Sequence, residues 1–463
     1  MSHKFMTSSI FLFLDLIVVS ASGWLYWLVI SKLVSISEVG QSTAVYSLVV
    51  LTATLAGLGM EYPLLKKTST EGSKIVGTSV LIEIIVTLAA FPFILSFLNN
   101  LHYEAMDSIS FIAILTLPFI SLGFIARFAL LGISASRTIL IIDTISTVAK
   151  FAAGYILVLS GFGVIGVLIS FMLQALIILC ISLILINKTI GFRIGDLKYI
   201  KGLITDGIVN LPSISSRTLI FNLSVVLLAS FGISTSDIGI FYIALMISFV
   251  AGGLISSTAY MVIPASSMAQ EDLSAASIRI GISLTAPVIS LLLASPGFVL
   301  SLIGKEYVAG QILLMILAVG ILPFAIVTNT LSRFNYLGKL RKLVFIGLIQ
   351  ALGFIVGFLL LVPLSESFGA ALSILISYSI ACIPSLIWSE KASVRYLVNV
   401  VIAVVAGWAI SFVIRLFSTP NVISEITILL TSIAVTMIVI FALKNTTITE
   451  VRSLLKIVVK NST

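Results

Sequence analysis

The sequence predicts an all-α integral membrane protein with about 14 transmembrane helices. Hydrophobic residues make up 59% of the 463 positions, and apolar runs of 18 or more residues follow one another along most of the chain. If each run crosses the membrane in turn, 21 of the 26 Lys and Arg residues lie on the same side of it. A water-soluble fold would need polar faces and longer polar loops, so we expect a polytopic helical membrane protein.

The apolar runs set the positions of the predicted helices. Each is close to the ~20 residues that cross the hydrocarbon core at ~1.5 Å per residue. Lipid offers the backbone no hydrogen-bond partner, so each span must be a helix. The run 277–302 is the least regular because it contains Pro287, Pro296 and Gly297. The predicted spans are 8–30, 41–60, 75–98, 109–131, 138–160, 164–187, 203–230, 238–260, 277–302, 310–332, 343–362, 367–388, 396–417 and 422–443.

The distribution of basic residues predicts the orientation. The side that carries the N-terminus holds 21 of them, and the opposite side holds only Lys32, Lys305 and Arg415. The other two, Lys150 and Arg217, lie deep inside predicted spans. Basic loops stay in the cytoplasm, so we expect a multi-pass plasma-membrane protein with both termini cytoplasmic. The net charge of +8 is explained by these loops and requires no nucleic-acid partner.

The chain also contains an internal repeat. Residues 35–40 (SISEVG) before the second span return as 234–239 (STSDIG) before the eighth, 199 residues later. Three further matches follow in order: Leu117-Pro118-Phe119 with Leu322-Pro323-Phe324, Arg127-Phe128 with Arg333-Phe334, and Phe162-Gly163 with Phe368-Gly369. The offset covers six spans, an even number, so both copies share one orientation. They are expected to be parallel repeats related by a pseudo-twofold axis along the membrane normal.

The repeat divides the chain into predicted parts. These are an N-terminal six-helix bundle (1–187), a cytoplasmic interfacial linker (188–202), a C-terminal six-helix bundle (203–390), two additional transmembrane helices (391–443) and a basic cytoplasmic tail (444–463). The linker mixes four basic residues with apolar ones and is expected at the membrane interface. Its bases either bind anionic lipid or only anchor the cytoplasmic side.

The repeated motifs resemble those of a known family. The matching stretches are Glu38-Val39-Gly40 with Tyr46-Ser47, Asp237-Ile238-Gly239-Ile240-Phe241-Tyr242-Ile243-Ala244, Pro264, Gly304-Lys305-Glu306-Tyr307 and Leu337-Gly338. In this order and spacing the chain resembles Wzx-type polysaccharide and lipid-linked oligosaccharide flippases. They form a branch of the multidrug/oligosaccharidyl-lipid/polysaccharide (MOP) exporter superfamily. The resemblance covers about residues 8–390, so the last two spans extend the usual twelve. Lipid II flippases, a sister branch, carry several bases in the N-terminal bundle, where this chain has only Lys150 in mid-span.

Five charged residues lie well inside the predicted spans, away from their end turns: Asp15, Glu83, Asp143, Lys150 and Arg217. A charge at mid-bilayer costs ~2.5–3.5 kcal/mol on insertion scales. One interpretation is structural, with Lys150 neutralised by Asp143, Asp15 or Glu83. The other is functional: Lys150 and Arg217 face a central cavity and bind the phosphate or diphosphate of a lipid-linked sugar. The three acids are candidates for ion coupling or charge pairing.

The resemblance implies alternating-access transport of a polyprenyl-linked oligosaccharide from the cytoplasmic to the outer leaflet. Its partners would be the lipid-linked substrate, membrane lipids and, functionally, glycosyltransferases of the same pathway. The alternative within the superfamily is a multidrug or cation antiporter, which would need acids in the cavity. An enzyme is not expected: the longest outer loop is about ten residues (99–108), and no metal spacing, cofactor motif or catalytic constellation occurs. The sequence therefore predicts no catalytic residue, metal or cofactor.

Overall fold

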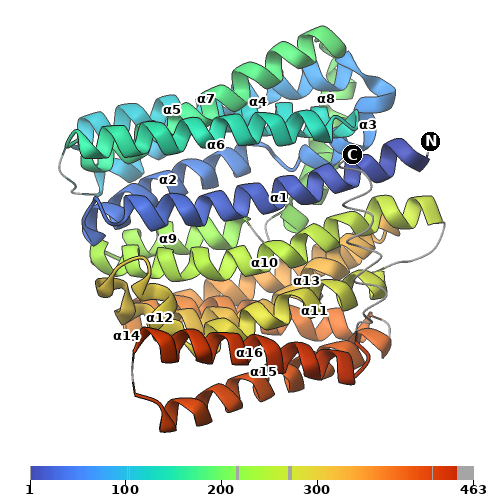
Figure 1. Cartoon of the computed structure of the whole chain (residues 1–463). Helices are drawn as coiled ribbons and strands as arrows, with labels where there is room; N and C mark the ends of the chain where they lie inside the picture. Colours follow the sequence, from blue (N-terminus) through green and yellow to red (C-terminus); the bar gives the residue numbers. More distant parts are fainter. Residues whose placement is uncertain are drawn as a thin grey trace. The chain divides into compact units, whose positions relative to one another are not determined.

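The computed structural model describes residues 2–101, 103, 105–214, 218–269, 274–389, 391–419 and 421–445. Every regular element in these residues is a helix, and eleven of the helices are long and apolar enough to cross a membrane. This confirms the predicted all-helical, multi-pass class. The helices are drawn in Figure 1.

The helix bounds follow the predicted spans closely. They are α1 (Ser2–Ile30), α2 (Ile36–Ala56), α3 (Glu61–Glu71), α4 (Ser73–Asn99), α5 (Met106–Gly132), α6 (Ser136–Leu159), α7 (Gly163–Thr189), α8 (Leu197–Ile214), α9 (Ile220–Ser230), α10 (Thr235–Ala269), α11 (Ser274–Ala294), α12 (Pro296–Ser301), α13 (Gln311–Tyr336), α14 (Leu340–Ile387), α15 (Lys391–Phe417) and α16 (Val422–Ala442), with a 3₁₀ turn at Lys305–Gly310. The long helix α14 contains the eleventh and twelfth spans. Its backbone leaves helical geometry at Ser365 and Glu366, inside the predicted loop 363–367.

Two details differ from the predicted spans. The loop after the second span contains a helix, α3. The ninth span ends at Ala294, because Ser295 precedes Pro296 and adopts a non-helical conformation with φ −145°. Each difference occurs where Gly, Pro or charged residues weaken the apolar run.

The helices form two compact units. The first unit comprises residues 1–20 and 243–463, and the second comprises residues 21–242. The chain passes from one unit to the other within α1 and within α10.

The second unit has a hydrophobic core at the end where α3 and α8 lie. Buried side chains from six helices meet there, among them Leu64 of α3, Ile75 of α4, Ile139 of α6, Ile186 of α7 and Leu203 of α8. The core therefore fixes α8, which follows the linker, against helices from the N-terminal half of the chain.

The repeat is visible as a reciprocal contact inside the second unit. A Cβ atom at Gly40 would overlap the carbonyl oxygen of Thr235, and one at Gly239 would lie 2.5 Å from the carbonyl oxygen of Ile36. Thr235 and Gly239 follow Ile36 and Gly40 by the same 199 residues. The starts of α2 and α10 thus touch through equivalent positions of the two repeated motifs.

The two helix starts are also capped in the same way. Ser35 and Glu38 form a capping box at α2. In the repeated motif, the Ser234 hydroxyl donates to Asp237 at 2.6 Å and accepts the Asp237 N–H at 3.1 Å. Capping side chains satisfy amide groups that a helix start leaves unpaired, so the shared SxxE/D pattern has a common structural cause.

The last two helices, α15 and α16, pack against α11 in the first unit. The hydroxyls of Ser290 and Ser432 are 2.6 Å apart, and a Cβ at Gly407 would overlap the hydroxyls of Ser290 and Thr436. Arg415 donates to Ser295 and to Glu425, at 2.9 Å each. Small and polar residues permit this close approach of membrane helices. Helices α15 and α16, red in Figure 1, run side by side and belong to this unit.

We predict the orientation of the chain from its basic residues, and cysteine labelling tests it. In a background without Cys180 and Cys382, Leu364→Cys should react with an impermeant maleimide in intact cells, because Leu364 is 82% exposed in the predicted external loop. Lys339→Cys, in a basic loop, should react only after permeabilisation. The opposite pair of results would place both termini outside the cytoplasm.

Candidate substrate site

Lys150 lies on α6 in the second unit and is almost fully buried. Its Nζ atom is 5.0 Å from the centre of the Tyr26 ring and 5.1 Å from that of Phe171. A desolvated cation over an aromatic face gains about 2 kcal/mol. Two such faces offset much of the cost of keeping an ammonium in the membrane.

The rings around Lys150 are held in place by their own contacts. The hydroxyls of Tyr26 and Ser170 are 2.7 Å apart, so one donates to the other. Tyr46 stacks on Phe171 with ring centres 4.0 Å apart. Gly154 lies one helical turn from Lys150, and a Cβ there would come within 2.9 Å of the Tyr26 ring. The small residue leaves room for the tyrosine beside the amine.

The aromatic side chains continue beyond this pair. Trp27 meets Tyr26 edge-on at 5.4 Å between ring centres and Tyr242 at 5.6 Å. We call Tyr26, Trp27, Tyr46, Phe171 and Tyr242 the aromatic cluster. Its members come from α1, α2, α7 and α10, and Lys150 places its ammonium over two of these rings, Tyr26 and Phe171. The sequence identified Lys150 but not these neighbours.

Asp143 is buried and forms its ion pair with Arg127 of α5. The predicted alternative was a pair between Asp143 and Lys150, seven residues apart on one helix. Within the described residues Lys150 has no ion pair with a carboxylate. The structure thus brings Lys150 together with aromatic rings and Asp143 together with a guanidinium.

The other two predicted acids, Asp15 and Glu83, are both buried. Asp15 is buried on the part of α1 that belongs to the first unit. Glu83 is buried on α4, close to Ser121 of α5 and to Gly57. Arg217 lies outside the described residues, so its predicted position in the cavity stays a prediction.

Glu61, at the start of α3, is a buried acid that sequence reasoning assigned to a loop. Burial raises the pKa of its carboxyl from about 4.5 to about 8. The only sequence signal is its position directly after Leu58-Gly59-Met60, which turn the chain back onto the bundle; Leu58 and Gly59 have positive φ.

We expect Glu61 to make stability depend on pH. Between about pH 4.5 and about pH 8 the folded carboxyl keeps its proton and the unfolded one releases it, so stability falls as pH rises through this window. Glu61→Gln should therefore raise the melting temperature near pH 8.5 and change it little near pH 4.5. The exposed Glu306 provides the control, as Glu306→Gln, which should follow the parent protein at both pH values. A Glu61→Gln profile parallel to that of the parent would exclude this cause.

Comparison with known proteins rests on structure. No family model and no curated protein matches the sequence. The lipid II flippase MurJ in an inward closed conformation aligns with a TM-score of 0.61 at 14% identity, covering 95% of this chain and 97% of that one. An inward-facing multidrug resistance MATE transporter of the MOP superfamily gives 0.59 at 16% identity, covering 84% and 94%.

A third similar structure is a MOP superfamily transporter from Pyrococcus furiosus, described as having a binding pocket of reversed polarity. It gives a TM-score of 0.55 at 15% identity, covering 85% of this chain and 96% of that one. The chain is thus a multi-pass helical membrane protein with the fold of MOP superfamily transporters. The solved structures it resembles are transporters and flippases rather than enzymes.

Proposed function

We propose that this protein is a flippase that moves a polyprenyl-(di)phosphate-linked oligosaccharide from the cytoplasmic to the outer leaflet by alternating access. The superfamily fold supports a transporter, and the Wzx-like motifs support this substrate class. The glycan and its phosphate would cross in a polar path while the lipid tail stays in the bilayer. Glycosyltransferases of the same pathway would supply the substrate.

The single observation that carries the proposal is the buried Lys150 without a carboxylate partner among the described residues. Aromatic faces stabilise its charge without neutralising it, so the amine keeps its capacity for an anion. A phosphate oxygen binds an ammonium more strongly than a ring does. Substrate entry would then require Tyr26 or Phe171 to move off the amine. Arg217 is proposed as the second phosphate ligand.

A second candidate function is the multidrug or cation antiporter of the same fold. The buried carboxylates Asp15, Glu83 and Glu61 favour it, because acids of this kind bind cations or exchange protons. Asp143 supports it less, because Arg127 already balances its charge. In the flippase proposal, Asp15 and Glu83 remain candidates for ion coupling.

Reconstitution distinguishes the two functions. The purified chain in proteoliposomes should move a fluorescent polyprenyl-diphosphate oligosaccharide between leaflets, measured by its accessibility to an impermeant quencher. The same vesicles should not accumulate ethidium under an imposed proton or sodium gradient. Ethidium uptake without glycolipid movement would favour the antiporter and refute the flippase.

A further inference from the structure

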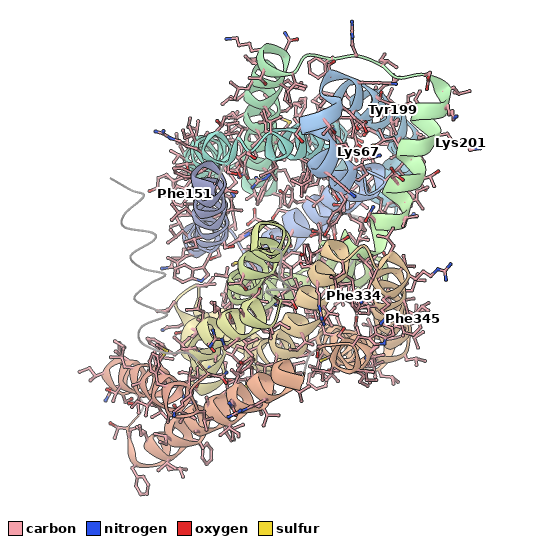
Figure 2. The ribbon with its side chains drawn as sticks, turned by 90° about the vertical axis from the view of Figure 1, so that its right-hand side faces the viewer. Lys67, Phe151, Tyr199, Lys201, Phe334 and Phe345 are labelled. Carbon is pink, nitrogen blue, oxygen red and sulfur yellow. The ribbon has the colours of Figure 1, made fainter. Side chains whose placement is uncertain are left out.

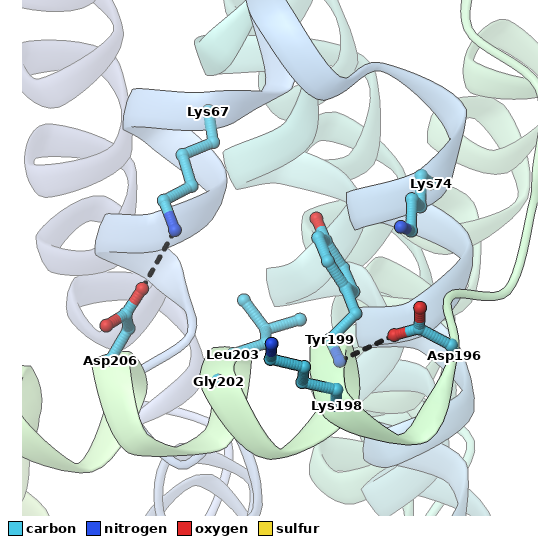
Figure 3. Close-up of a pocket in the computed structure, with 8 residues that line it drawn as sticks. All are labelled: Lys67, Lys74, Asp196, Lys198, Tyr199, Gly202, Leu203 and Asp206. Atoms are coloured by element: carbon cyan, nitrogen blue, oxygen red, sulfur yellow. Dashed lines mark hydrogen bonds and ion pairs between the residues drawn. The ribbon is translucent and has the colours of Figure 1, made fainter.

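A pocket of about 360 Å³ lies at one end of the second unit, between α3, the start of α4 and α8. Its charged lining residues are Lys67, Lys74, Lys198, Asp196 and Asp206, and we call it the basic pocket. Figure 2 shows Lys67 and Tyr199 together at this end, with Lys201 on α8 nearby. Figure 3 shows the basic pocket itself. It is separate from Lys150, which lies in mid-span.

Both acids of the basic pocket are already engaged. Asp196 accepts the N–H of Tyr199 at 2.8 Å and so caps the start of α8. Asp206 accepts a hydrogen bond from Lys67 at 2.8 Å, and this bond raises the pKa of Lys67. Both interactions are drawn in Figure 3.

Two lysines keep unbalanced charge. The Lys74 ammonium lies 4.3 Å from the centre of the Tyr199 ring, while the Tyr199 hydroxyl is hydrogen-bonded to Glu71. In the part of the chain that the structure describes, neither Lys74 nor Lys198 forms an ion pair. They approach the basic pocket from different helices, so an anion between them would be held on two sides.

The walls of the basic pocket are fixed by backbone contacts. The Arg193 N–H donates to the Ser73 carbonyl, and the Gly195 N–H donates to the Thr78 hydroxyl, each at 2.8 Å. Farther along α8, a Cβ at Gly59 would overlap the Gly207 carbonyl oxygen. The linker before α8 is therefore docked on α4, and the lysines are positioned before a ligand arrives. Such preorganisation lowers the entropic cost of binding.

Large apolar side chains lie exposed in the segment 192–197, which leads into the basic pocket. Phe192 is 41% exposed, Ile194 64% and Leu197 83%. They alternate with exposed Arg193 and Lys198 in the segment docked on α4. Apolar side chains interleaved with bases are typical of segments that insert into the headgroup region of an anionic membrane.

From this arrangement we propose that the basic pocket binds the headgroup phosphate of an anionic membrane phospholipid, with Lys74 and Lys198 as its ligands. Phe192, Ile194 and Leu197 would contact the acyl chains of the same leaflet. A lipid held there would bridge the start of α4 and α8. The site is distinct from the proposed transport site, so each claim can fail without the other.

Native mass spectrometry of the full-length protein tests the site, with phosphatidylglycerol titrated into detergent solution. The double variant Lys74→Gln with Lys198→Gln should bind phosphatidylglycerol roughly 10- to 30-fold more weakly, at about a decade or less per lysine. Phosphatidylcholine, which is zwitterionic, should bind the parent protein more weakly than phosphatidylglycerol.

The matched control is Lys188→Gln with Lys201→Gln. It removes the same charge at two residues of the linker and α8 that do not line the pocket. It should retain the affinity of the parent protein, and both double variants should elute as folded monodisperse protein. An equal loss of phosphatidylglycerol affinity in the two double variants would show a general electrostatic attraction to the basic surface. It would overturn the proposal of a specific site. If inorganic phosphate binds the parent protein as tightly as phosphatidylglycerol does, the assignment of the basic pocket to a phospholipid is wrong.

Discussion

Lys150→Met is expected to reduce glycolipid translocation roughly 10- to 100-fold, the loss of one charge-assisted contact of about 1.5–3 kcal/mol. Methionine has a similar length and fills the space between Tyr26 and Phe171 without charge. Removing a buried charge that has no carboxylate partner among the described residues does not destabilise the bundle. The amount of folded protein should therefore equal that of the parent. The measurement pairs the proteoliposome assay with fluorescence-detected size exclusion.

Four companion variants define the role of the charge. Lys150→Arg should be partly active, since a guanidinium also lies well over aromatic rings. Arg217→Ala should abolish export with abundance intact, and Arg217→Lys should keep part of it because the bidentate fork alone is lost. Asp143→Asn added to Lys150→Met should restore nothing, because Arg127 is the partner of Asp143.

A structural role for Lys150 predicts a different pattern. Lys150→Met would then lower the abundance of folded protein together with transport, and the combined variant with Asp143→Asn would recover both. Full activity of Arg217→Ala or of Lys150→Met would remove the phosphate-binding claim for that residue.

Gly40→Ala is expected to cause the largest loss of stability, about 3 kcal/mol or more for overpacking that requires backbone movement. The added methyl would overlap the Thr235 carbonyl oxygen, and a main-chain atom cannot rotate aside as a side chain can. Gly239→Ala should destabilise less, because its Cβ would lie 2.5 Å from the Ile36 oxygen. Thermal unfolding in detergent measures both.

The control for these glycines is Gly23→Ala. Gly23 is also helical, but a Cβ there has nothing within 4 Å. Alanine at that position should leave the melting temperature unchanged or raise it slightly. Gly40→Ala with the stability of Gly23→Ala would contradict the close contact between the repeats. Because Gly40 and Gly239 share this contact, the double variant should cost less than the sum of the single changes.

The sequence alone determined the class of this protein, its spans and its duplication. Lipid imposes the class and the spans locally, because every backbone group must be paired within its own helix and every span must be long enough to cross. The duplication is visible in the matched motifs around Gly40 and Gly239. A base inside an apolar run, such as Lys150, is also visible without any knowledge of its neighbours.

The tertiary structure decided what surrounds each of these residues. Helical periodicity placed Asp143 and Lys150 on one face, but Arg127 comes from another helix and takes the carboxylate. Tyr26 and Phe171 likewise reach Lys150 from two other helices, α1 and α7. The linear pattern gives the face that a side chain occupies and not the helix that packs against it. Glu61 and the docking of α8 on α3 and α4 also depend on such packing, so only the folded chain shows them.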